Sequence, residues 1–353
     1  MPKMRHVIFD PMSKLIDHLT RLTGLRDRDT LDVTLASALA DLLHPRCVAV
    51  YRSVGDSHDQ HWTTRARLDL GDAVASADSA WADLADLPRL TDHPLRCDAL
   101  ARQATVCGGP NDGVSVFPLM SDRETVGVVE VITDAPLDAS ALGMVSSVLR
   151  IFHNFQSLLD YSERDTLTGL LNRKTFDDSF FKLMQRLPPG AKGGDDRRCA
   201  EPALAHTWLA MVDIDFFKSV NDTHGHLIGD EVLLLLSRLM RNTLRFHDRL
   251  YRFGGEEFVI VMRCDTEPHA AAVLERVRRN TEAFAFPQVG RMTISAGFTL
   301  IMPTDSPASA LDRADRAVYH AKGQGRNQVC SHAVLAAAGQ PPQADKVGDF
   351  ELF

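Results

Sequence analysis

The stretch that decides the fold reads Arg252-Phe253-Gly254-Gly255-Glu256-Glu257-Phe258, which places two glycines and two acids between two apolar runs. Residues 248–253 and 258–262 have strand-forming composition, so the pattern predicts a β-hairpin with Gly254-Gly255 as its two-residue turn. Glycine adopts positive φ at no steric cost, and without a side chain it lets another molecule approach the backbone. Two carboxylates beside such a turn indicate a site for a bulky ligand. The alternative is an ordinary tight turn followed by solvated acids.

A second acidic segment lies earlier in the chain. It begins with Leu209-Ala210-Met211-Val212-Asp213-Ile214-Asp215, whose apolar run predicts a buried strand that ends in two acids. It continues with Phe216-Phe217-Lys218-Ser219-Val220-Asn221-Asp222 and Gly225-His226-Leu227-Ile228-Gly229-Asp230. Together with the glycine hairpin, these segments resemble the GGDEF family of diguanylate cyclases in its Gly-Gly-Glu-Glu-Phe form. Two further motifs extend the resemblance over roughly residues 165–332, namely Asp165-Thr166-Leu167-Thr168-Gly169-Leu170-Leu171-Asn172-Arg173 and Ala321-Lys322-Gly323-Gln324-Gly325-Arg326-Asn327.

The resemblance implies a palm-like α/β fold for residues 165–334, with a mainly antiparallel sheet flanked by helices. The layout of residues 1–138 resembles a GAF-type sensor domain, also α/β, because two amphipathic helix patterns lead into a strand and a closing hairpin. These predicted elements lie at residues 11–22, 29–43, 47–51, 114–120 and 126–132. Residues 188–202 are predicted to be a mobile surface loop, and residues 335–353 a disordered tail.

Residues 139–164 have the pattern of one long helix that links the two domains. One apolar stripe follows the alternating three and four spacing of a coiled-coil seam with Gln156 as its polar interruption, and a second stripe lies beside it. We expect one stripe to pack on the sensor domain and the other on a partner subunit. The alternative is a single wide stripe packed only within its own domain. The first stripe is Leu142, Val145, Leu149, Phe152 and Leu159, and the second is Met144, Val148, Ile151, Phe155 and Leu158.

Composition excludes several classes of protein and of site. The 353 residues are long enough for two domains, and a net charge of −8 argues against nonspecific nucleic-acid binding. The six cysteines form no Cys-x-x-Cys pair, which favours reduced thiols over disulfides or a zinc site. No run of eighteen apolar residues and no signal-type N-terminus occurs, so we expect a cytoplasmic protein without a membrane segment. His58, His61 and His93 are predicted to be solvated loop residues and not a haem or metal site.

The resemblance implies that the protein condenses two GTP molecules into cyclic di-GMP and releases two pyrophosphates. Because each subunit would hold one GTP, turnover requires a homodimer with facing sites. Two rivals remain: a catalytically weak module that binds GTP or cyclic di-GMP and signals through a partner, and a cyclase that acts on a single nucleotide.

Phosphoryl transfer of this kind requires charge neutralisation and activation of the attacking hydroxyl, and Mg²⁺, with Mn²⁺ as an alternative, suits the task through oxygen ligands. The resemblance assigns metal binding to the Asp213 carboxylate, the Ile214 carbonyl and the Glu256 carboxylate. Glu256 and Glu257 compete as general base. Adjacent strand residues point to opposite faces, which favours one of them unless the hairpin tip is irregular, and we take Glu256 as the essential acid. Asp215 is expected to be structural.

Cationic and polar residues around the acids would bind the substrate. The resemblance gives Lys218 to the triphosphate, and it turns Lys322 and Arg326, four apart on the last predicted helix, toward the phosphates. Ordinary solvated helix charges are the alternative. The predicted substrate-binding set also includes Phe217, His226, Gly254 and Gly255.

Asn221 and Asp230 match the guanine-reading positions of the family. A carboxylate accepts hydrogen bonds from guanine N1 and N2, and a wrong base would leave that acid unpaired. The alternatives are a turn role for Asn221 and a helix N-terminal charge for Asp230.

The sequence Arg245-Phe246-His247-Asp248 has the spacing of the family's product-inhibition site. Arginine donates two parallel hydrogen bonds to the O6 and N7 edge of guanine, and the acid accepts from other base donors. Arg276 is a further candidate for this site. The alternative is an exposed i,i+3 ion pair between Arg245 and Asp248 at a helix end.

Overall fold

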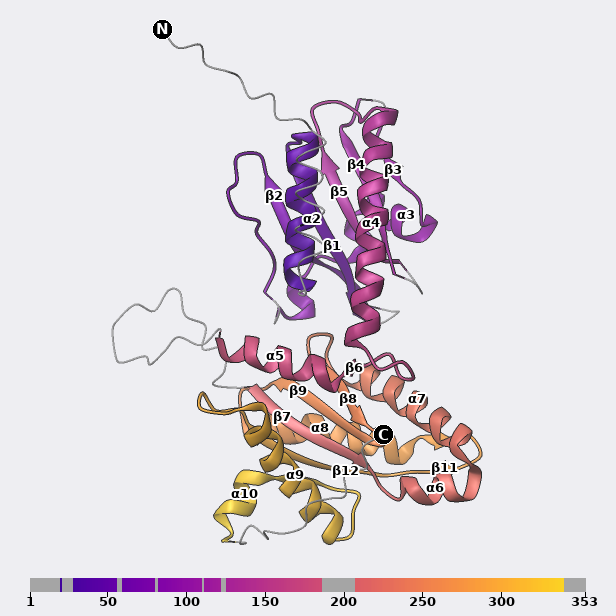
Figure 1. Ribbon diagram of the computed structural model, residues 1–353, viewed down its shortest axis with the longest axis vertical. Coiled ribbons are helices and arrows are strands. Elements are labelled where there is room, and N and C mark those ends of the chain that lie inside the picture. The colour runs from indigo at the N-terminus through magenta and orange to yellow at the C-terminus, as the bar shows by residue number, and fades with distance from the viewer. Residues whose placement is uncertain are drawn as a thin grey trace, which may run out of the picture. The chain divides into compact units, whose positions relative to one another are not determined.

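The computed structural model describes residues 20, 28–55, 59–79, 82–109, 111–121, 125–185 and 207–339 (Figure 1). The chain forms two compact units, Met1–Ser162 and Glu163–Phe353. The predicted loop at 188–202, most of the predicted helix at 11–22 and the tail after residue 339 lie outside the described residues. Among the helices that the structure does describe, each is too short or too polar to cross a membrane.

The first unit is a five-stranded antiparallel sheet with strand order β2-β1-β5-β4-β3. The predicted closing hairpin is confirmed, since its two strands are β4 and β5 and pair directly. In the part of this unit that the structure describes, three α-helices and two 3₁₀ turns accompany the sheet. The bounds are α2 (Arg28–Leu43), β1 (Cys47–Gly55), β2 (Gln60–Asp69), η1 (Leu84–Asp86), η2 (Leu90–Asp92), α3 (Pro94–Arg102), β3 (Val106–Cys107), β4 (Val114–Met120), β5 (Thr125–Ile132) and α4 (Ala139–Glu163).

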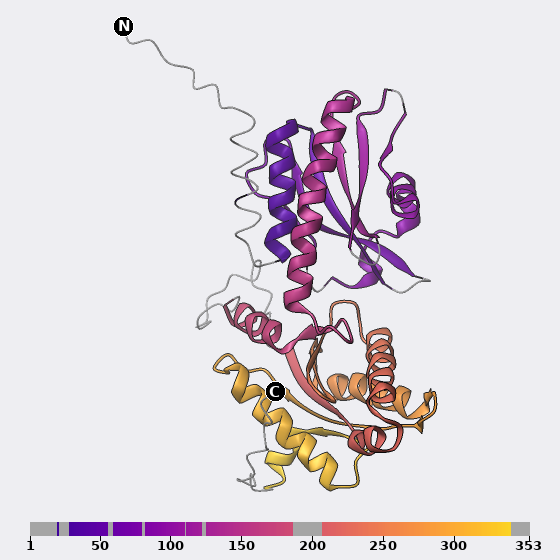
Figure 2. The same cartoon turned by 45° about the vertical axis from the view of Figure 1, so that its right-hand side comes forward.

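Strand alternation divides the side chains of this sheet between two cores. Val48 and Val50 of β1 pack with α2 and α4 on one face. Cys47, Ala49 and Tyr51 of the same strand pack with α3 on the other face. Figure 2 shows α2 and α4 on one side of the sheet and α3 on the opposite side.

Helix α4 buries the predicted seam in its own unit. Val145, Val148, Phe152, Gln156 and Leu159 are buried, and the apolar members pack in the same core as α2. Val148 was assigned to the other stripe, so the division into two stripes is wrong at that position because the buried face is wider than a seam. The Gln156 side chain is 7% exposed and its Oε1 has no hydrogen-bond partner.

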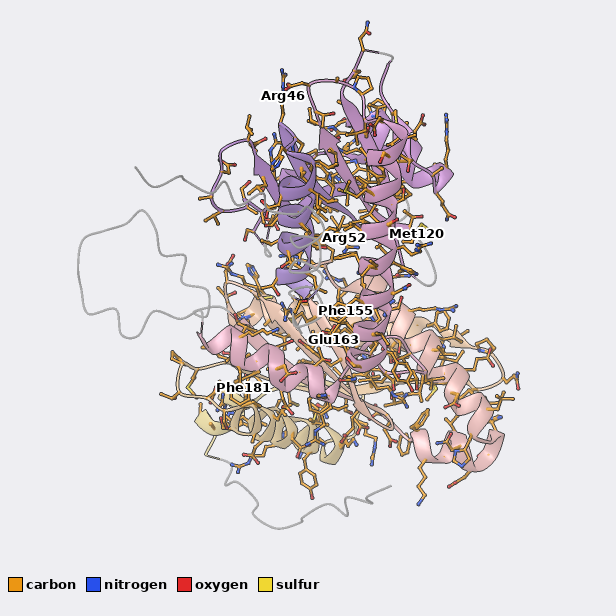
Figure 3. All side chains as sticks on the ribbon, turned by 45° about the horizontal axis from the view of Figure 1, so that its top comes forward. Arg46, Arg52, Met120, Phe155, Glu163 and Phe181 are labelled. Carbon is orange, nitrogen blue, oxygen red and sulfur yellow. The ribbon has the colours of Figure 1, made fainter. Side chains whose placement is uncertain are left out.

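Part of the second stripe of α4 faces solvent in this unit. Met144 and Leu158 of this stripe are 37% and 67% exposed, whereas Phe155, labelled in Figure 3, is partly buried against the core. Tyr161, which belongs to neither stripe, is 79% exposed further along α4. Packing of this exposed stripe on a partner subunit stays a prediction.

The second unit is a six-stranded sheet with strand order β13-β12-β7-β9-β8-β6. The four central strands are antiparallel and the two edge strands are parallel to their neighbours, which confirms the predicted mainly antiparallel α/β fold. The bounds are β6 (Leu171–Asn172), α5 (Arg173–Gln185), β7 (Thr207–Ile214), α6 (Phe217–His224), α7 (His226–Thr243), β8 (Arg249–Gly254), β9 (Glu257–Arg263), α8 (Glu267–Ala283), β10 (Ala285–Phe286), β11 (Gly290–Arg291), β12 (Ile294–Leu300), α9 (Pro307–Gly323), β13 (Val329–Ser331) and α10 (His332–Ala337).

Helices cover both faces of this sheet. Ala210 and Val212 of β7 pack with α6, α7 and α8, while Leu209 and Met211 pack with α5 and α9. Every residue of β7 is buried, as the continuous apolar run predicts for a central strand covered on both sides. The end of β7 is therefore a rigid platform for the acids that follow its core residues.

The predicted start of the disordered tail at residue 335 is wrong for its first residues. Helix α10 extends to Ala337, and alanine-rich sequence at its end has high helix propensity.

Candidate active site at the end of the central strands

The glycine hairpin joins β8 to β9, but its turn lies one residue later than predicted. Gly254 is the last residue of β8 and pairs with Glu257, so Gly255 and Glu256 form the turn. The pairing skips Phe253, which is an extra residue in β8 and accounts for the shift. Gly255 has φ +50°, in the left-handed region that favours glycine.

The strand register decides which acid shares a face with Asp213. Asp213 of β7 pairs directly with Glu257 of β9, and directly opposed residues project to the same face of a sheet. Glu256 lies in the turn, so the hairpin tip is irregular and strand alternation does not decide between Glu256 and Glu257. Both acids nevertheless act on Asp213, whose pKa is raised to about 6. Burial is the largest cause, and the charges of Glu256 and Glu257 also raise the pKa, against the opposing effect of Lys322.

Asp213 has one carboxylate oxygen that is satisfied and one that is not. Oδ2 accepts a hydrogen bond from Lys322 Nζ at 2.7 Å, whereas the buried Oδ1 has no partner. Its side chain is 9% exposed. A buried, unsatisfied carboxylate oxygen close to two further acids is an oxygen-only donor set that suits a hard divalent cation.

The protein alone does not supply a complete cage at this place. In the described part of the chain, no three His, Cys, Asp or Glu side chains are grouped closely enough to hold a metal ion. Magnesium sites formed by one or two carboxylates completed by water and substrate phosphates have this property. The residues present therefore fit a cation that binds together with a phosphorylated substrate.

Asp315 of α9 belongs to this acidic group, and sequence reasoning missed it. Burial raises the pKa of Glu257, and the charge of Asp315 raises it further. Asp315 lies seven residues before Lys322, which places both on one face of α9 after two helical turns. That spacing is the signal from which Asp315 could have been found.

Lys322 and Arg326 do not lie on one helical face as predicted. Helix α9 ends at Gly323, and Gly325 and Arg326 have φ of +106° and +66°. Glycines after the last turn stop the helix before Arg326. The guanidinium of Arg326 instead lies over the ring of Phe216, 4.5 Å from its centroid.

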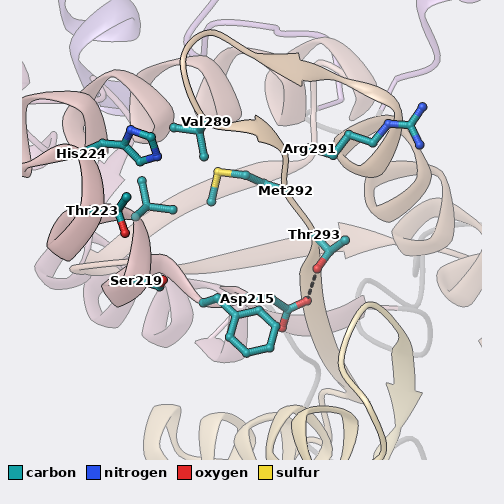
Figure 4. A pocket seen from close by; sticks show the side chains of 10 residues that line it. Asp215, Ser219, Thr223, His224, Val289, Arg291, Met292 and Thr293 are labelled. Atoms are coloured by element: carbon teal, nitrogen blue, oxygen red, sulfur yellow. Dashed lines mark hydrogen bonds between the residues drawn. The ribbon is translucent and has the colours of Figure 1, made fainter.

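Asp215 has the structural role that was expected. It accepts hydrogen bonds from Thr293 Oγ1 and Ser295 Oγ, both at 2.7 Å, and from the Asn327 backbone N–H at 3.0 Å. Figure 4 shows the bond from Thr293. This buried carboxylate ties the end of β7 to β12 and to the segment that carries Arg326.

The predicted guanine-reading residues lie on the adjacent helices α6 and α7. A Cβ atom added to Gly229 would approach Asn221 Oδ1 to 2.0 Å, so glycine is needed for Asn221 to lie against α7. Asp230, the next residue, is exposed and is the fifth residue of α7, beyond the N-terminal charge position considered as its alternative. His226 is the exposed first residue of α7.

The two remaining residues from α6 differ in accessibility. Lys218 is exposed, as a residue that meets a triphosphate must be. Phe217 is 4% exposed and packs in the core, which leaves its backbone and not its ring for ligand contact.

A cavity of about 260 Å³ lies beside α6, where residues of this helix face residues 289–293 (Figure 4). None of the predicted site residues lines it, so it is separate from the acidic site. Its lining residues are Asp215, Phe216, Ser219, Val220, Thr223, His224, Val289, Arg291, Met292 and Thr293.

Comparison with known proteins matches this half of the chain to one family. Residues 162–328 match the family model described as "Diguanylate cyclase, GGDEF domain". We call these residues, which are similar to that family over just under half of the chain, the GGDEF domain. Diguanylate cyclase DgcZ of Escherichia coli (strain K12) is 33% identical over 199 residues, which are 55% of this chain and 62% of the relative. Response regulator PleD of Caulobacter vibrioides is 36% identical over 187 residues, 51% of this chain and 38% of the relative.

The chain thus spans less than two thirds of the length of either relative. Among solved structures, the coiled coil and GGDEF domain of DgcB from Caulobacter crescentus, in complex with c-di-GMP, is 28% identical, with a TM-score of 0.46. This match covers 55% of the present chain and 97% of that chain.

In the GGDEF domain, the Arg245 to Asp248 segment is a turn and not a helix end. Helix α7 stops at Thr243, and Asp248 Oδ2 accepts from the Arg245 backbone N–H at 2.9 Å. The Asp248 side chain is only 2% exposed, and burial raises its pKa. The exposed ion pair considered as the alternative is therefore wrong, because the acid is turned inward to hold the turn that presents Arg245.

Outside the GGDEF domain, His61 contradicts its prediction as a solvated loop residue. It lies on β2 and is buried, with Nδ1 2.7 Å from the Leu87 carbonyl oxygen and Nε2 3.0 Å from Asp59 Oδ1. Both ring nitrogens are used within the protein, which leaves neither for a metal. His93 is half-buried at the start of α3, and His58 lies outside the described residues.

Proposed function

We propose that the chain is a diguanylate cyclase that condenses two GTP into cyclic di-GMP and two pyrophosphates. The observation that carries the proposal is the buried, unpartnered Oδ1 of Asp213 beside the Gly255-Glu256 turn of a GGDEF domain. A buried carboxylate oxygen without a hydrogen-bond partner costs stability, which a binding partner can offset. A divalent cation that arrives with the triphosphate meets this requirement.

In this mechanism the chain holds the substrate and moves one proton. Asp213, Glu256 and the Ile214 carbonyl hold Mg²⁺ or Mn²⁺, which when bound neutralises phosphate charge. Lys322, which is paired with Asp213 at 2.7 Å, would help to neutralise the charge of a triphosphate bound beside that carboxylate. Glu256 is the essential acid. Glu257 competes with Glu256 as acceptor of the 3′-hydroxyl proton. Burial and the charge of Asp315 raise the pKa of Glu257.

Specificity and turnover follow from the same arrangement. Asn221 and the exposed Asp230 read guanine from α6 and α7, and Lys218, Arg326 and the backbone at Phe217 bind the phosphates. Because one chain has one such set of residues, two GTP molecules require two chains as a homodimer with facing sites. The exposed Met144, Leu158 and Tyr161 on α4 offer an apolar surface for that association.

Regulation is proposed at two places. Residues 1–138 act as a GAF-like sensor, with residues 139–164 as the connection to the GGDEF domain. Cyclic di-GMP inhibits through Arg245, whose exposed guanidinium contacts guanine while the inward-facing Asp248 fixes the turn.

The test is incubation of the protein with GTP and Mg²⁺, followed by chromatographic separation of nucleotides. Wild type and Asp178→Asn, an exposed acid on α5 that serves as control, are expected to form cyclic di-GMP, and Glu256→Gln is expected to form none. A Glu256→Gln variant with wild-type turnover would refute the assignment. GTP binding without product from wild type would favour the signalling module, and a cyclic mononucleotide would favour the single-nucleotide cyclase.

A further inference from the structure

The side chain of Arg252 joins the acidic turn to the start of the GGDEF domain. Its Nε and Nη2 both donate to the Gly255 carbonyl oxygen, at 3.1 and 2.9 Å. Its Nη1 donates to Asp165 Oδ1 and Oδ2, at 3.0 and 3.2 Å. The Arg252 and Asp165 side chains are 12% and 23% exposed, so these contacts are largely shielded from water. All three guanidinium nitrogens are thus engaged by two partners.

The turn needs such a restraint because the strand ladder is irregular there. The extra residue Phe253 interrupts the pairing of β8 with β9. Gly254 and Gly255 have φ of +153° and +50°, and glycine restricts the backbone less than any other residue. The two bonds from Arg252 to the Gly255 carbonyl fix the peptide unit that connects Gly255 to Glu256. They therefore limit the directions in which the Glu256 side chain can leave the turn.

The other end of this connection is itself held firmly. Asp165 Oδ1 accepts from Thr168 N at 2.8 Å and from Thr168 Oγ1 at 2.6 Å. The Asp165 N–H donates to the Leu170 carbonyl, and the Gly169 N–H donates to the Asp165 carbonyl. Burial acts to raise the pKa of Asp165, but the bonds from Thr168 and Arg252 lower it, which keeps the carboxylate charged. Helix α4 ends at Glu163, two residues before this anchor.

We propose that Arg252 is a positioning residue that sets the orientation of Glu256 and couples it to Asp165. This inference rests on the proposed cyclase function for its kinetic consequence, but its effect on metal binding is independent of turnover. Arginine suits this position because the separate nitrogens of its planar fork reach the carbonyl and the carboxylate together, whereas the three donors of a lysine ammonium sit on one nitrogen and cannot reproduce this geometry. The alternative is that Arg252 only stabilises the fold.

The experiment compares wild type, Arg252→Lys and Arg249→Lys in the full-length chain. Arg249 lies three residues earlier on the same strand and serves as the matched control. The measurements are Mn²⁺ affinity in the presence of a nonhydrolysable GTP analogue, by titration with paramagnetic detection, kcat and KM for GTP, and the thermal unfolding midpoint. A misplacement of about 1 Å costs up to about a hundredfold in rate. We expect Arg252→Lys to lower kcat by at least about tenfold and to weaken Mn²⁺ binding by severalfold, with KM within about threefold of wild type.

Several outcomes would overturn the inference. If Arg252→Lys folds and has kcat and Mn²⁺ affinity within twofold of wild type, Arg252 does not position Glu256. If Arg249→Lys shows the same losses, the effect belongs to the strand and not to the fork. Asp165→Asn tests the coupling: its effect on kcat should be much smaller in the Arg252→Lys background than in wild type, whereas full additivity would remove Asp165 from the inference. A wild type that forms no product would sink the cyclase proposal alone, because the Mn²⁺ titration still tests the positioning role.

Discussion

Replacement of Asp213 by asparagine is expected to stabilise the second unit at alkaline pH while it removes activity. Burial raises the pKa of Asp213 from 3.8 to about 6 in the folded chain. The folded state therefore binds a proton between these values that the unfolded state does not bind. The contribution of Asp213 to stability is therefore greatest below about pH 4 and falls as the pH rises to about 6, and the loss of this contribution is complete above about pH 7.

The size of the effect follows from the shift in pKa. One pKa unit corresponds to about 1.4 kcal/mol, so ionised Asp213 lowers the free energy of unfolding by about 3 kcal/mol at pH 8. Asparagine keeps the shape without the charge. The pKa of about 6 already contains the opposing effect of Lys322, so the loss of this ion pair is included in that figure. The net gain in Asp213→Asn is about 3 kcal/mol at pH 8 and close to zero at pH 4.

The assay is urea unfolding in metal-free buffer at pH 4, 6 and 8, followed by tryptophan fluorescence. The chain has three tryptophans, and Trp208 lies on β7 in the second unit. With Trp62 and Trp81 replaced by phenylalanine, fluorescence reports that unit alone. Mg²⁺ with a nonhydrolysable GTP analogue should then raise the unfolding midpoint of the Asp213 protein but not of the variant. A variant less stable than its parent at pH 8, or equally stabilised by the metal, would refute the reasoning.

Two further predictions concern packing. Gly229→Ala places a Cβ 2.0 Å from Asn221 Oδ1, so it should displace Asn221 and raise KM for GTP by about tenfold, measured by steady-state kinetics beside Gly143→Ala, where the space is open. Gln156→Leu removes an amide oxygen that is buried on α4 without a hydrogen-bond partner. The substitution should raise the free energy of unfolding of the first unit by about 1–3 kcal/mol, measured by urea unfolding. A destabilised variant would mean that Gln156 has a hydrogen-bond partner in solution.

The sequence predicted the strands of the second unit well because their apolar runs are long. The continuous apolar run before Asp213 predicts a central strand of a sheet that is covered on both faces, and β7 is such a strand. The position of the turn was predicted less well, since it depends on register. The extra residue Phe253 shifts the turn to Gly255 and Glu256, and a bulge leaves no mark in composition.

Spacing arguments failed where the chain is not regular. Lys322 and Arg326 are four apart, but the intervening Gly323 ends α9, a stop signal present in the sequence that the helical spacing argument ignored. Arg245 and Asp248 are three apart, but α7 has already ended, so the acid caps a turn in place of an exposed pair. On α4 the apolar residues cover a wide face of the helix, so the sequence did not show that Val148 is buried together with the first stripe.

The connection through Arg252 could not have been predicted from any motif, for a physical reason. One of its two acceptors is the backbone carbonyl of Gly255, and every residue has such a carbonyl, so no residue type marks it. The other acceptor, Asp165, lies 87 positions earlier in a separate motif. Each motif alone accounts for its own residues, as a turn that carries acids or as the start of a domain. Only the fold brings the two motifs together, and it does so through Arg252. The motif Gly254-Gly255-Glu256-Glu257 that follows Arg252 gives no sign of this connection. The positioning role that we propose for Arg252 is thus inferred from its hydrogen bonds and not from its place beside the acids.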